Sequence, residues 1–227
     1  MKVSKIILVS IISLSLSIPI AYATSYATLH LDLVGGGTRE GSIVTFSGQL
    51  DSLNGTGLPH RAVFIEDDTS YLIRPDIIIA VTTTDSDGKF LVSWKVVPKD
   101  NGKSFHFYAR FLGSNSFGFT RSETYESMVE HSNQSSMDII PSKTIPIWFK
   151  NASKMWYEGQ IRDVDYAWSI KNLLEYGIIK SNMVVDSELK FPAWSKSNAN
   201  WFADSEISRE EYANNLQYLL ENKIIKI

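Results

Sequence analysis

Carboxylates in the first half of the chain are the side chains whose type and spacing could do chemistry. Glu66, Asp67, Asp68, Asp85 and Asp87 fall at the expected ends of strands and in turns. Calcium binds oxygen ligands of this kind. The Asp-x-Asp-Gly spacing differs from that of an EF-hand loop, so turn formation is the competing interpretation. We retain Asp67, Asp85 and Asp87 as weak calcium candidates and predict no other metal site and no cofactor.

Local signatures of catalysis are missing from the sequence. It contains no His-Glu-x-x-His zinc helix and no Gly-x-Ser-x-Gly nucleophile elbow. The four histidines include no pair at the i, i+3 or i, i+4 spacing of a helical metal site. Cysteine is absent, which excludes disulfides, thiolate metal sites and cysteine nucleophiles. We therefore expect a protein that is not an enzyme.

Tryptophan gives the sharpest binding hypothesis, because exposed indoles stack on sugar rings and anchor protein interfaces. Trp148, Trp156, Trp194 and Trp201 follow a helical period. That periodicity favours a shared core, with ligand binding as the alternative. Trp168 lies off the periodic apolar stripe of its helix, so we predict it to be an exposed contact residue.

Three Asn-x-Ser/Thr sequons, at Asn54, Asn133 and Asn151, are glycosylation candidates if the chain is exported. Asn54 lies in an expected loop and Asn133 in an expected linker, which favours access to both. Asn151 lies in an expected helix and ranks below them.

The first 23 residues have the organisation of a secretory signal peptide. Lys2 and Lys5 form a basic start, residues 6–18 are apolar apart from serines, and Ala21-Tyr22-Ala23 matches a small-x-small cleavage site. An uncleaved membrane anchor is the alternative. We expect cleavage after Ala23 and an extracellular or cell-surface location.

The charge of the chain argues against nucleic acid as a partner. The formal net charge is −3, and removal of the two signal-peptide lysines makes the exported chain more acidic. The sequence has no basic run, so it lacks the electrostatic footprint of a nucleic-acid-binding protein.

Residues 24–130 predict an all-β immunoglobulin-like sandwich, because short period-two segments alternate with turn residues. The expected strands are 26–34, 42–50, 62–67, 76–84, 89–97, 104–113 and 120–130. Asp87-Gly88 and Asn101-Gly102 are expected to close tight hairpins, since these dipeptides reach positive φ at low cost. Trp94 is expected to fill the core.

Four segments of this half carry a family resemblance. Val44–Leu50, Gly57–Pro59, Thr83–Phe90 and Tyr108–Phe111 together resemble the immunoglobulin-like modules of prokaryotic surface proteins. The resemblance implies a fold and says almost nothing about a ligand.

Residues 144–227 contain an internal repeat with an offset of 46 residues. Repeat 1 (residues 145–180) aligns without a gap with repeat 2 (residues 191–226). The identical pairs are Pro146/Pro192, Trp148/Trp194, Lys150/Lys196, Ile161/Ile207, Tyr166/Tyr212, Ala167/Ala213, Leu173/Leu219, Leu174/Leu220, Glu175/Glu221, Ile178/Ile224, Ile179/Ile225 and Lys180/Lys226. Each repeat has the pattern of an amphipathic helical hairpin, so we expect a small all-α domain of two repeated helical hairpins. Residues 131–143 lack periodicity and are expected to be a linker.

The repeated Pro-x-Trp-x-Lys frame at Pro146 and Pro192 is followed by aromatic residues and, in repeat 1, by Gly-Ile-Ile at Gly177. This pattern resembles the repeat that closes many exported surface proteins of ammonia-oxidising archaea. The paired tryptophans of that repeat are replaced here by Met155-Trp156 and Trp201-Phe202. The resemblance implies a location more than a mechanism.

We therefore expect an exported, non-enzymatic interaction or adhesion module at the cell surface. In this hypothesis the sandwich is a spacer and the helical repeats dock to a cell-envelope component, a partner protein or a second copy. Two alternatives remain open. One is an envelope-anchoring protein, since Trp168 to Ile179 and Ser208 to Ala213 distantly resemble S-layer homology repeats. The other is a hydrolase or a calcium-dependent carbohydrate-binding protein that uses the carboxylates between Glu66 and Asp87.

Overall fold

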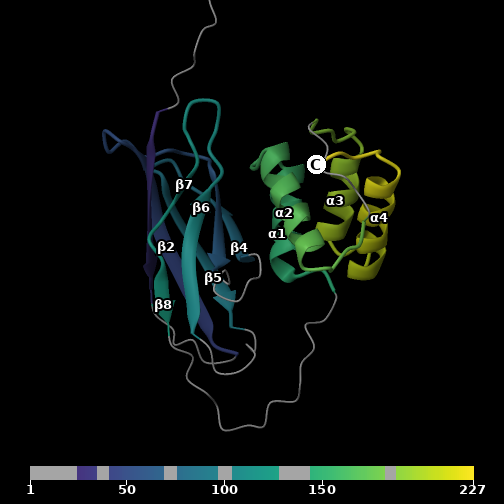
Figure 1. The fold of residues 1–227 in the computed structure, drawn as a ribbon, viewed down its shortest axis with the longest axis horizontal. Coiled ribbons are helices and arrows are strands. Elements are labelled where there is room, and N and C mark those ends of the chain that lie inside the picture. The colour runs from purple at the N-terminus through teal and green to yellow at the C-terminus, as the bar shows by residue number, and fades with distance from the viewer. Residues whose placement is uncertain (1–24, 35–40, 69–75, 97–103, 128–143, 182–187) are drawn as a thin grey trace, which may run out of the picture.

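The computed structural model describes residues 25–34, 41–68, 76–96, 104–127, 144–181 and 188–227. The expected signal peptide, the expected linker and the Asn101-Gly102 turn lie outside these residues. Within the described part of the chain, eight strands form two antiparallel sheets, and four helices lie beside one of them (Figure 1).

The strands follow the expected segments closely. They are β1 (Ala27–Leu33), β2 (Ile43–Ser52), β3 (Ala62–Asp67), β4 (Ile77–Thr83), β5 (Lys89–Lys95), β6 (Phe105–Phe111), β7 (Thr120–Arg121) and β8 (Tyr125–Ser127). The single strand expected over 120–130 is wrong, because this segment is divided into β7 and β8. At the break, the Ser122 hydroxyl accepts the N–H of Ala109 at 2.9 Å in place of a backbone partner.

The two sheets pack face to face as a sandwich. One has the order β1-β2-β5 and the other β4-β3-β6-β7, with β8 also paired to β6. Alternate residues of each strand point between the sheets, as the period of a strand requires. Trp94 is buried there, with its ring centroid 5.2 Å from that of Phe105 and 5.7 Å from that of Phe107, which confirms its expected place in the core.

Asp87-Gly88 does not close a hairpin, because β4 and β5 belong to different sheets. The Asp85 carboxylate accepts the N–H groups of Asp87 and Lys89 at 2.9 Å, and Gly88 has a φ of 80°. A Cβ atom at Gly88 would lie 2.6 Å from the carbonyl oxygen of Leu50. The predicted turn is therefore present, but it carries the chain from one sheet to the other. Strands β5 and β6, on either side of the second predicted hairpin, also lie in different sheets.

The helices are α1 (Ile147–Tyr157) and α2 (Asp163–Glu175) in repeat 1, and α3 (Ser195–Ala203) and α4 (Arg209–Glu221) in repeat 2. A residue with positive φ follows each helix: Gly159 (74°), Gly177 (64°), Ser205 (66°) and Lys223 (55°). In every case the next N–H bonds to the carbonyl five residues earlier, which is the Schellman ending. The repeats thus share their helix endings, although only repeat 1 keeps glycine there.

At one such pair of equivalent positions, Gly177 and Lys223, the two reciprocal substitutions are expected to change the free energy of unfolding in opposite directions. Lys223→Gly should raise the free energy of unfolding by about 0.5–1 kcal/mol, because lysine is held in the left-handed region. Gly177→Lys, the reciprocal change, should lower it by about 1–2 kcal/mol. Urea unfolding followed by far-ultraviolet circular dichroism measures both, and changes of the same sign would contradict the strain at Lys223.

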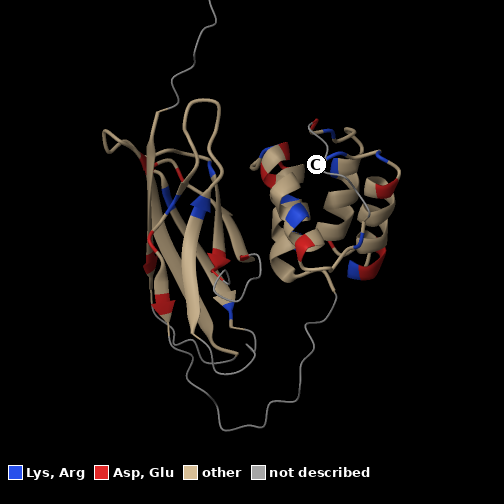
Figure 2. Ribbon diagram, in the orientation of Figure 1, with Lys and Arg blue, Asp and Glu red and all other residues tan. Residues whose placement is uncertain are grey.

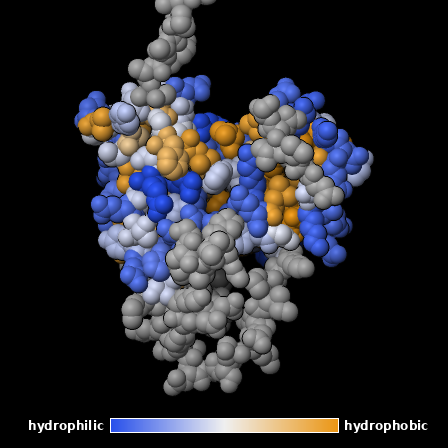
Figure 3. All heavy atoms as spheres, viewed as in Figure 1, coloured by the Kyte–Doolittle hydropathy of each residue, from blue (hydrophilic) through white to orange (hydrophobic). Residues whose placement is uncertain are grey.

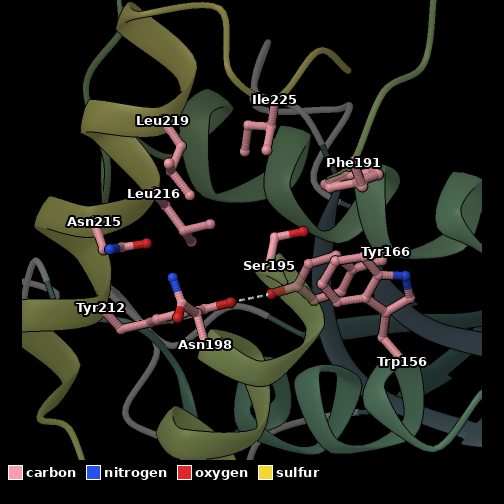
Figure 4. Close-up of a pocket in the computed structure, with 10 residues that line it drawn as sticks. All are labelled: Trp156, Tyr166, Phe191, Ser195, Asn198, Tyr212, Asn215, Leu216, Leu219 and Ile225. Carbon is pink, nitrogen blue, oxygen red and sulfur yellow. Dashed lines mark hydrogen bonds between the residues drawn. The ribbon is translucent and has the colours of Figure 1, made fainter. Parts of the chain in front are cut away.

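Equivalent aromatic side chains of the two repeats meet in the helical core (Figure 4). Trp156 stacks on Tyr166 with ring centroids 4.0 Å apart, and Phe202 stacks on Tyr212 at 4.4 Å. The hydroxyl groups of Tyr166 and Tyr212 then hydrogen-bond to each other at 2.6 Å. The two hairpins are therefore joined through the same pair of sequence positions.

The helices form a third layer on the sandwich. All six residues of β3 are buried, although successive side chains of a strand point to opposite faces. Val63 and Ile65 enter the core between the sheets, whereas Ala62 and Phe64 belong to the hydrophobic cluster of the helices. Helices α1 and α2 contact the neighbouring strand β4 (Figure 1). The four-strand path β4-β3-β6-β7 is thus covered on both faces along β3.

Candidate interaction surfaces

The covered face of repeat 1 is the surface that meets the sheet. It comprises Trp148 and Met155 of α1 and Trp168 and Asn172 of α2. The first three of these side chains belong to or pack against the cluster that also contains sheet residues Ala62, Phe64, Ile78 and Val81. In Figure 3, hydrophobic side chains reach the surface on both halves near the boundary between the sandwich and the helices. Hydrophilic side chains occupy much of the outer edges.

A polar cluster lies beside this apolar contact, on the same face of the sheet. Register pairs Glu66 with Tyr108 and Phe64 with Arg110, so Arg110 stands diagonally from Glu66. Arg110 Nε lies 2.8 Å from the Oε1 atom of Glu66 in an ion pair, and its guanidinium also donates to the Tyr108 hydroxyl. That hydroxyl lies 2.5 Å from Glu66 Oε2 and 2.7 Å from Asp76 Oδ2. Because it has one proton, it can donate to only one carboxylate at a time.

The environment of this cluster changes its acid–base properties. Burial raises the pKa of the Glu66 carboxyl above its ordinary value, and the charge of Arg110 offsets only part of this effect. Burial and the nearby Glu66 charge raise the pKa of the Tyr108 hydroxyl. Burial alone would lower the pKa of the Arg110 guanidinium, but Glu66 raises it overall. The cluster therefore depends on Arg110 as the cation facing a buried carboxylate.

Trp168 belongs to this contact and is not an exposed residue, so that prediction is wrong. Its side chain is half-buried, and the guanidinium carbon of Arg110 lies 5.1 Å from its ring centroid. Its neighbour one turn later, Asn172, donates to the backbone carbonyl of Asp76 at 3.0 Å. Trp168 lies off the apolar stripe of its own hairpin because it serves the contact with the sheet.

The other four tryptophans of the helical repeats divide between core and surface. Trp148 and Trp156 are buried, with exposed fractions of 5% and 1%, as the core interpretation predicts. Trp194 and Trp201 are exposed at 49% and 46%, so the core interpretation is wrong for these two. Trp148 and Trp194 are equivalent residues of the two repeats. Their difference arises because α1 lies against β4, whereas α3 has no comparable contact with the described strands.

The open face of repeat 2 consists of the positions equivalent to the covered face: Trp194 at the N-cap of α3, Trp201 of α3, and Asn214 and Tyr218 of α4. All four are exposed. Helical spacing places Glu210, Asn214, Tyr218 and Glu221 along one stripe of α4, with an acidic residue at each end. The open face therefore combines three large aromatic side chains with an acidic rim.

The calcium candidates are not brought together. Asp67 pairs in register with Ile77 and Ala62 with Thr83, so Asp67 lies at the opposite end of the β3–β4 pair from Asp85 and Asp87. Asp67 accepts the backbone N–H of His106 at 3.0 Å, whereas Asp85 shapes its own turn. Within the described ranges, no group of three or more metal-binding side chains occurs. The three-residue calcium prediction is therefore wrong in geometry.

Two sequons are accessible. Asn54 lies in an exposed turn and Asn151 on the exposed side of α1. Asn133 lies outside the described residues. Glycosylation of Asn54 and Asn151 therefore remains a prediction.

A cavity between the hairpins is too small for an organic ligand (Figure 4). Its volume is about 10 Å³, and Trp156, Tyr166, Tyr212 and Asn215 are among its lining residues. A cavity of this size accommodates about one water molecule. The helical core is therefore a packed interior, and interaction chemistry belongs to the surface.

Lys and Arg are interspersed with Asp and Glu along the ribbons of both halves of the molecule (Figure 2). Among the described residues, no helix combines the length and hydrophobicity needed to cross a bilayer.

Comparisons with known proteins give no family. No family model matches the sequence, and no curated protein matches it. Among solved structures, the CARDB domain of PF1109 from Pyrococcus furiosus is similar, with a TM-score of 0.32 and 10% identity over 47% of this chain and 97% of that one. BslA, a bacterial hydrophobin, has a TM-score of 0.26 and 10% identity over 48% of this chain and 99% of its own. At these TM-scores neither similarity carries an argument.

Proposed function

We propose that this chain is an exported, non-enzymatic interaction protein of the cell surface. In this proposal, an immunoglobulin-like sandwich forms the rigid base and the helical repeats form the docking unit. The apolar leader with its Ala-Tyr-Ala site supports export. The resemblance of the repeats to the closing segment of archaeal surface proteins supports the same location.

The open face of repeat 2 carries the proposal. Solvent-facing helix positions are usually polar, and aromatic residues are enriched where proteins bind one another. Trp194 and Trp201 instead expose nearly half of their surface on one side of α3. Tyr218 adds a third exposed aromatic on α4. Repeat 1 uses the equivalent face to contact the sheet, which supports a contact role for the open face of repeat 2.

Docking through exposed aromatic side chains is the form of this function that we favour over calcium-dependent carbohydrate binding. The carbohydrate alternative needs carboxylates that converge on a cation. Asp67 and the Asp85 turn lie at opposite ends of their strands. The open face needs no cation, because burial of aromatic surface provides the free energy of association.

The test is retention on cell envelopes. Residues 24–227 would be mixed at increasing concentration with detergent-washed envelopes of the source organism, and the sedimented protein would be measured. We expect saturable retention that falls at least about tenfold in a Trp194→Ala/Trp201→Ala variant, as loss of two interface anchors implies. Tyr125→Ala removes an exposed aromatic of β8 and is the matched control. No retention, or equal retention of both variants, would contradict docking through the open face.

A further inference from the structure

The two repeats have the same backbone plan but different neighbours. Equivalent residues end their helices at positive φ, and equivalent tyrosines join their hairpins. The covered face of repeat 1 packs on a β-sheet. The open face of repeat 2 occupies the same positions on the same plan, so its shape also suits the outer face of a sheet.

The chain itself presents a second sheet face of the required kind. On the side of β2 and β5 that points away from the core, Ile43 and Leu91 are exposed at 62% and 65%. Between them, Thr45 pairs with Ser93, and their hydroxyl oxygens lie 3.0 Å apart. This outer β2–β5 face therefore has two apolar side chains flanking a small, flat centre that an indole ring can cover.

Charges at the edges of the two faces are opposite. Lys89 and Lys95 lie at the two ends of β5 and are exposed on its outer side. At about 3.3 Å per residue, they are about 20 Å apart along the strand. Glu210 and Glu221 bound the open face and are about 17 Å apart at 1.5 Å per residue of helix. An acidic rim of this span matches a basic rim of similar span.

We propose that copies of this chain associate head to tail, with the open face of repeat 2 of one copy against the outer β2–β5 face of the next. The proposal rests on the docking function assigned above and names its partner as a second copy. Because the two faces differ, the contact is heterologous, and an open assembly keeps one free face of each kind at its ends. The contact therefore builds closed rings or open filaments. Three half-exposed aromatics form a small interface, so we expect a dissociation constant on the order of 10⁻⁵ M.

Two variants, each lacking one face, test the proposal by complementation. Trp194→Ala/Trp201→Ala removes the open face and keeps the sheet face. Leu91→Glu removes the sheet face and keeps the open face. Sedimentation velocity of residues 24–227 over about 5–500 µM, a range chosen to span the expected dissociation constant, should show growing assemblies for the wild type and for Tyr125→Ala. Each face variant alone should stay monomeric, and an equimolar mixture of the two should give a one-to-one dimer and nothing larger.

Other outcomes overturn the proposal in distinguishable ways. A wild-type monomer at every concentration excludes self-association, while tryptophan-dependent retention on envelopes would leave the docking function in place. Dimerisation of Leu91→Glu alone would mean that two open faces meet each other. Assembly of the wild type without envelope retention would contradict the envelope partner and support the head-to-tail contact.

Discussion

Replacing Trp156 with alanine is expected to lower the free energy of unfolding by about 3–5 kcal/mol. The indole is buried, stacks on Tyr166 at 4.0 Å and donates from Nε1 to the Asp163 carboxylate at 2.8 Å. Truncation therefore removes apolar contacts at the junction of the two hairpins and leaves a cavity. Urea unfolding followed by far-ultraviolet circular dichroism would measure the loss.

Trp201→Ala is the matched control for this prediction, because it removes the same side chain from an exposed position of repeat 2. Its effect on unfolding should stay within about 1 kcal/mol. Equal losses in the two variants would mean that Trp201 is also part of the folded core, which would contradict the open face.

Replacing Arg110 with methionine is expected to cost about 3–5 kcal/mol of folding stability. The guanidinium pairs with the buried Glu66 carboxylate, donates to Tyr108 and lies against the Trp168 ring. Methionine fills part of the volume but leaves the Glu66 charge without its paired cation. The cost should be measured at pH 7 by urea unfolding.

A double-variant cycle separates the lost ion pair from lost packing. Adding Glu66→Gln to the Arg110→Met background should recover part of the stability, because it removes the unpaired charge. Lowering the pH should also recover part of the stability lost in Arg110→Met. The pKa of Glu66 is already raised by burial, and loss of Arg110 raises it further. A carboxyl whose folded pKa lies above its unfolded value contributes stability at low pH and loses it as pH rises through the folded pKa.

The gap between wild type and Arg110→Met should therefore narrow as pH falls from 7 towards 5. A gap that is independent of pH, together with no recovery by Glu66→Gln, would assign the loss to packing against Trp168 alone.

The polar cluster also bears on how the two halves of the molecule behave. Asn172 and Trp168 of α2 contact Asp76 and Arg110 of the sandwich, next to the apolar contact of α1. A spacer that only carries a docking unit does not need such contacts. The sandwich and repeat 1 instead form one continuous packed unit, which leaves repeat 2 as the outward-facing part.

Much of the local structure could be predicted from the sequence. The run of strand-forming residues between turns predicted β3 with its observed bounds. The repeat at an offset of 46 residues predicted the helices and the aromatic positions that join them. These features depend on residues that are close in the chain, or on a pattern that occurs in both repeats. Strand pairing was harder to predict from the sequence. Asp87-Gly88 favours the same turn whether the chain returns to the same sheet or crosses to the other.

The polar cluster required the tertiary structure. Glu66 and Arg110 meet only because β3 and β6 pair in one register, although they are far apart in sequence. The unbroken apolar run at the start of β3 was the available signal, since a strand with one solvated face alternates in polarity.

The sequence by itself determined where the aromatic side chains stand on each helix, because the helical period decides which residues share a face. It did not determine which of those faces is buried. Trp148 and Trp194 are the same residue at the same position of the repeat, yet one lies in the core and the other is half-exposed. Only the packing of β3 and β4 against repeat 1 distinguishes them, because a single sheet face can cover one of two equivalent helical faces and leaves the other open.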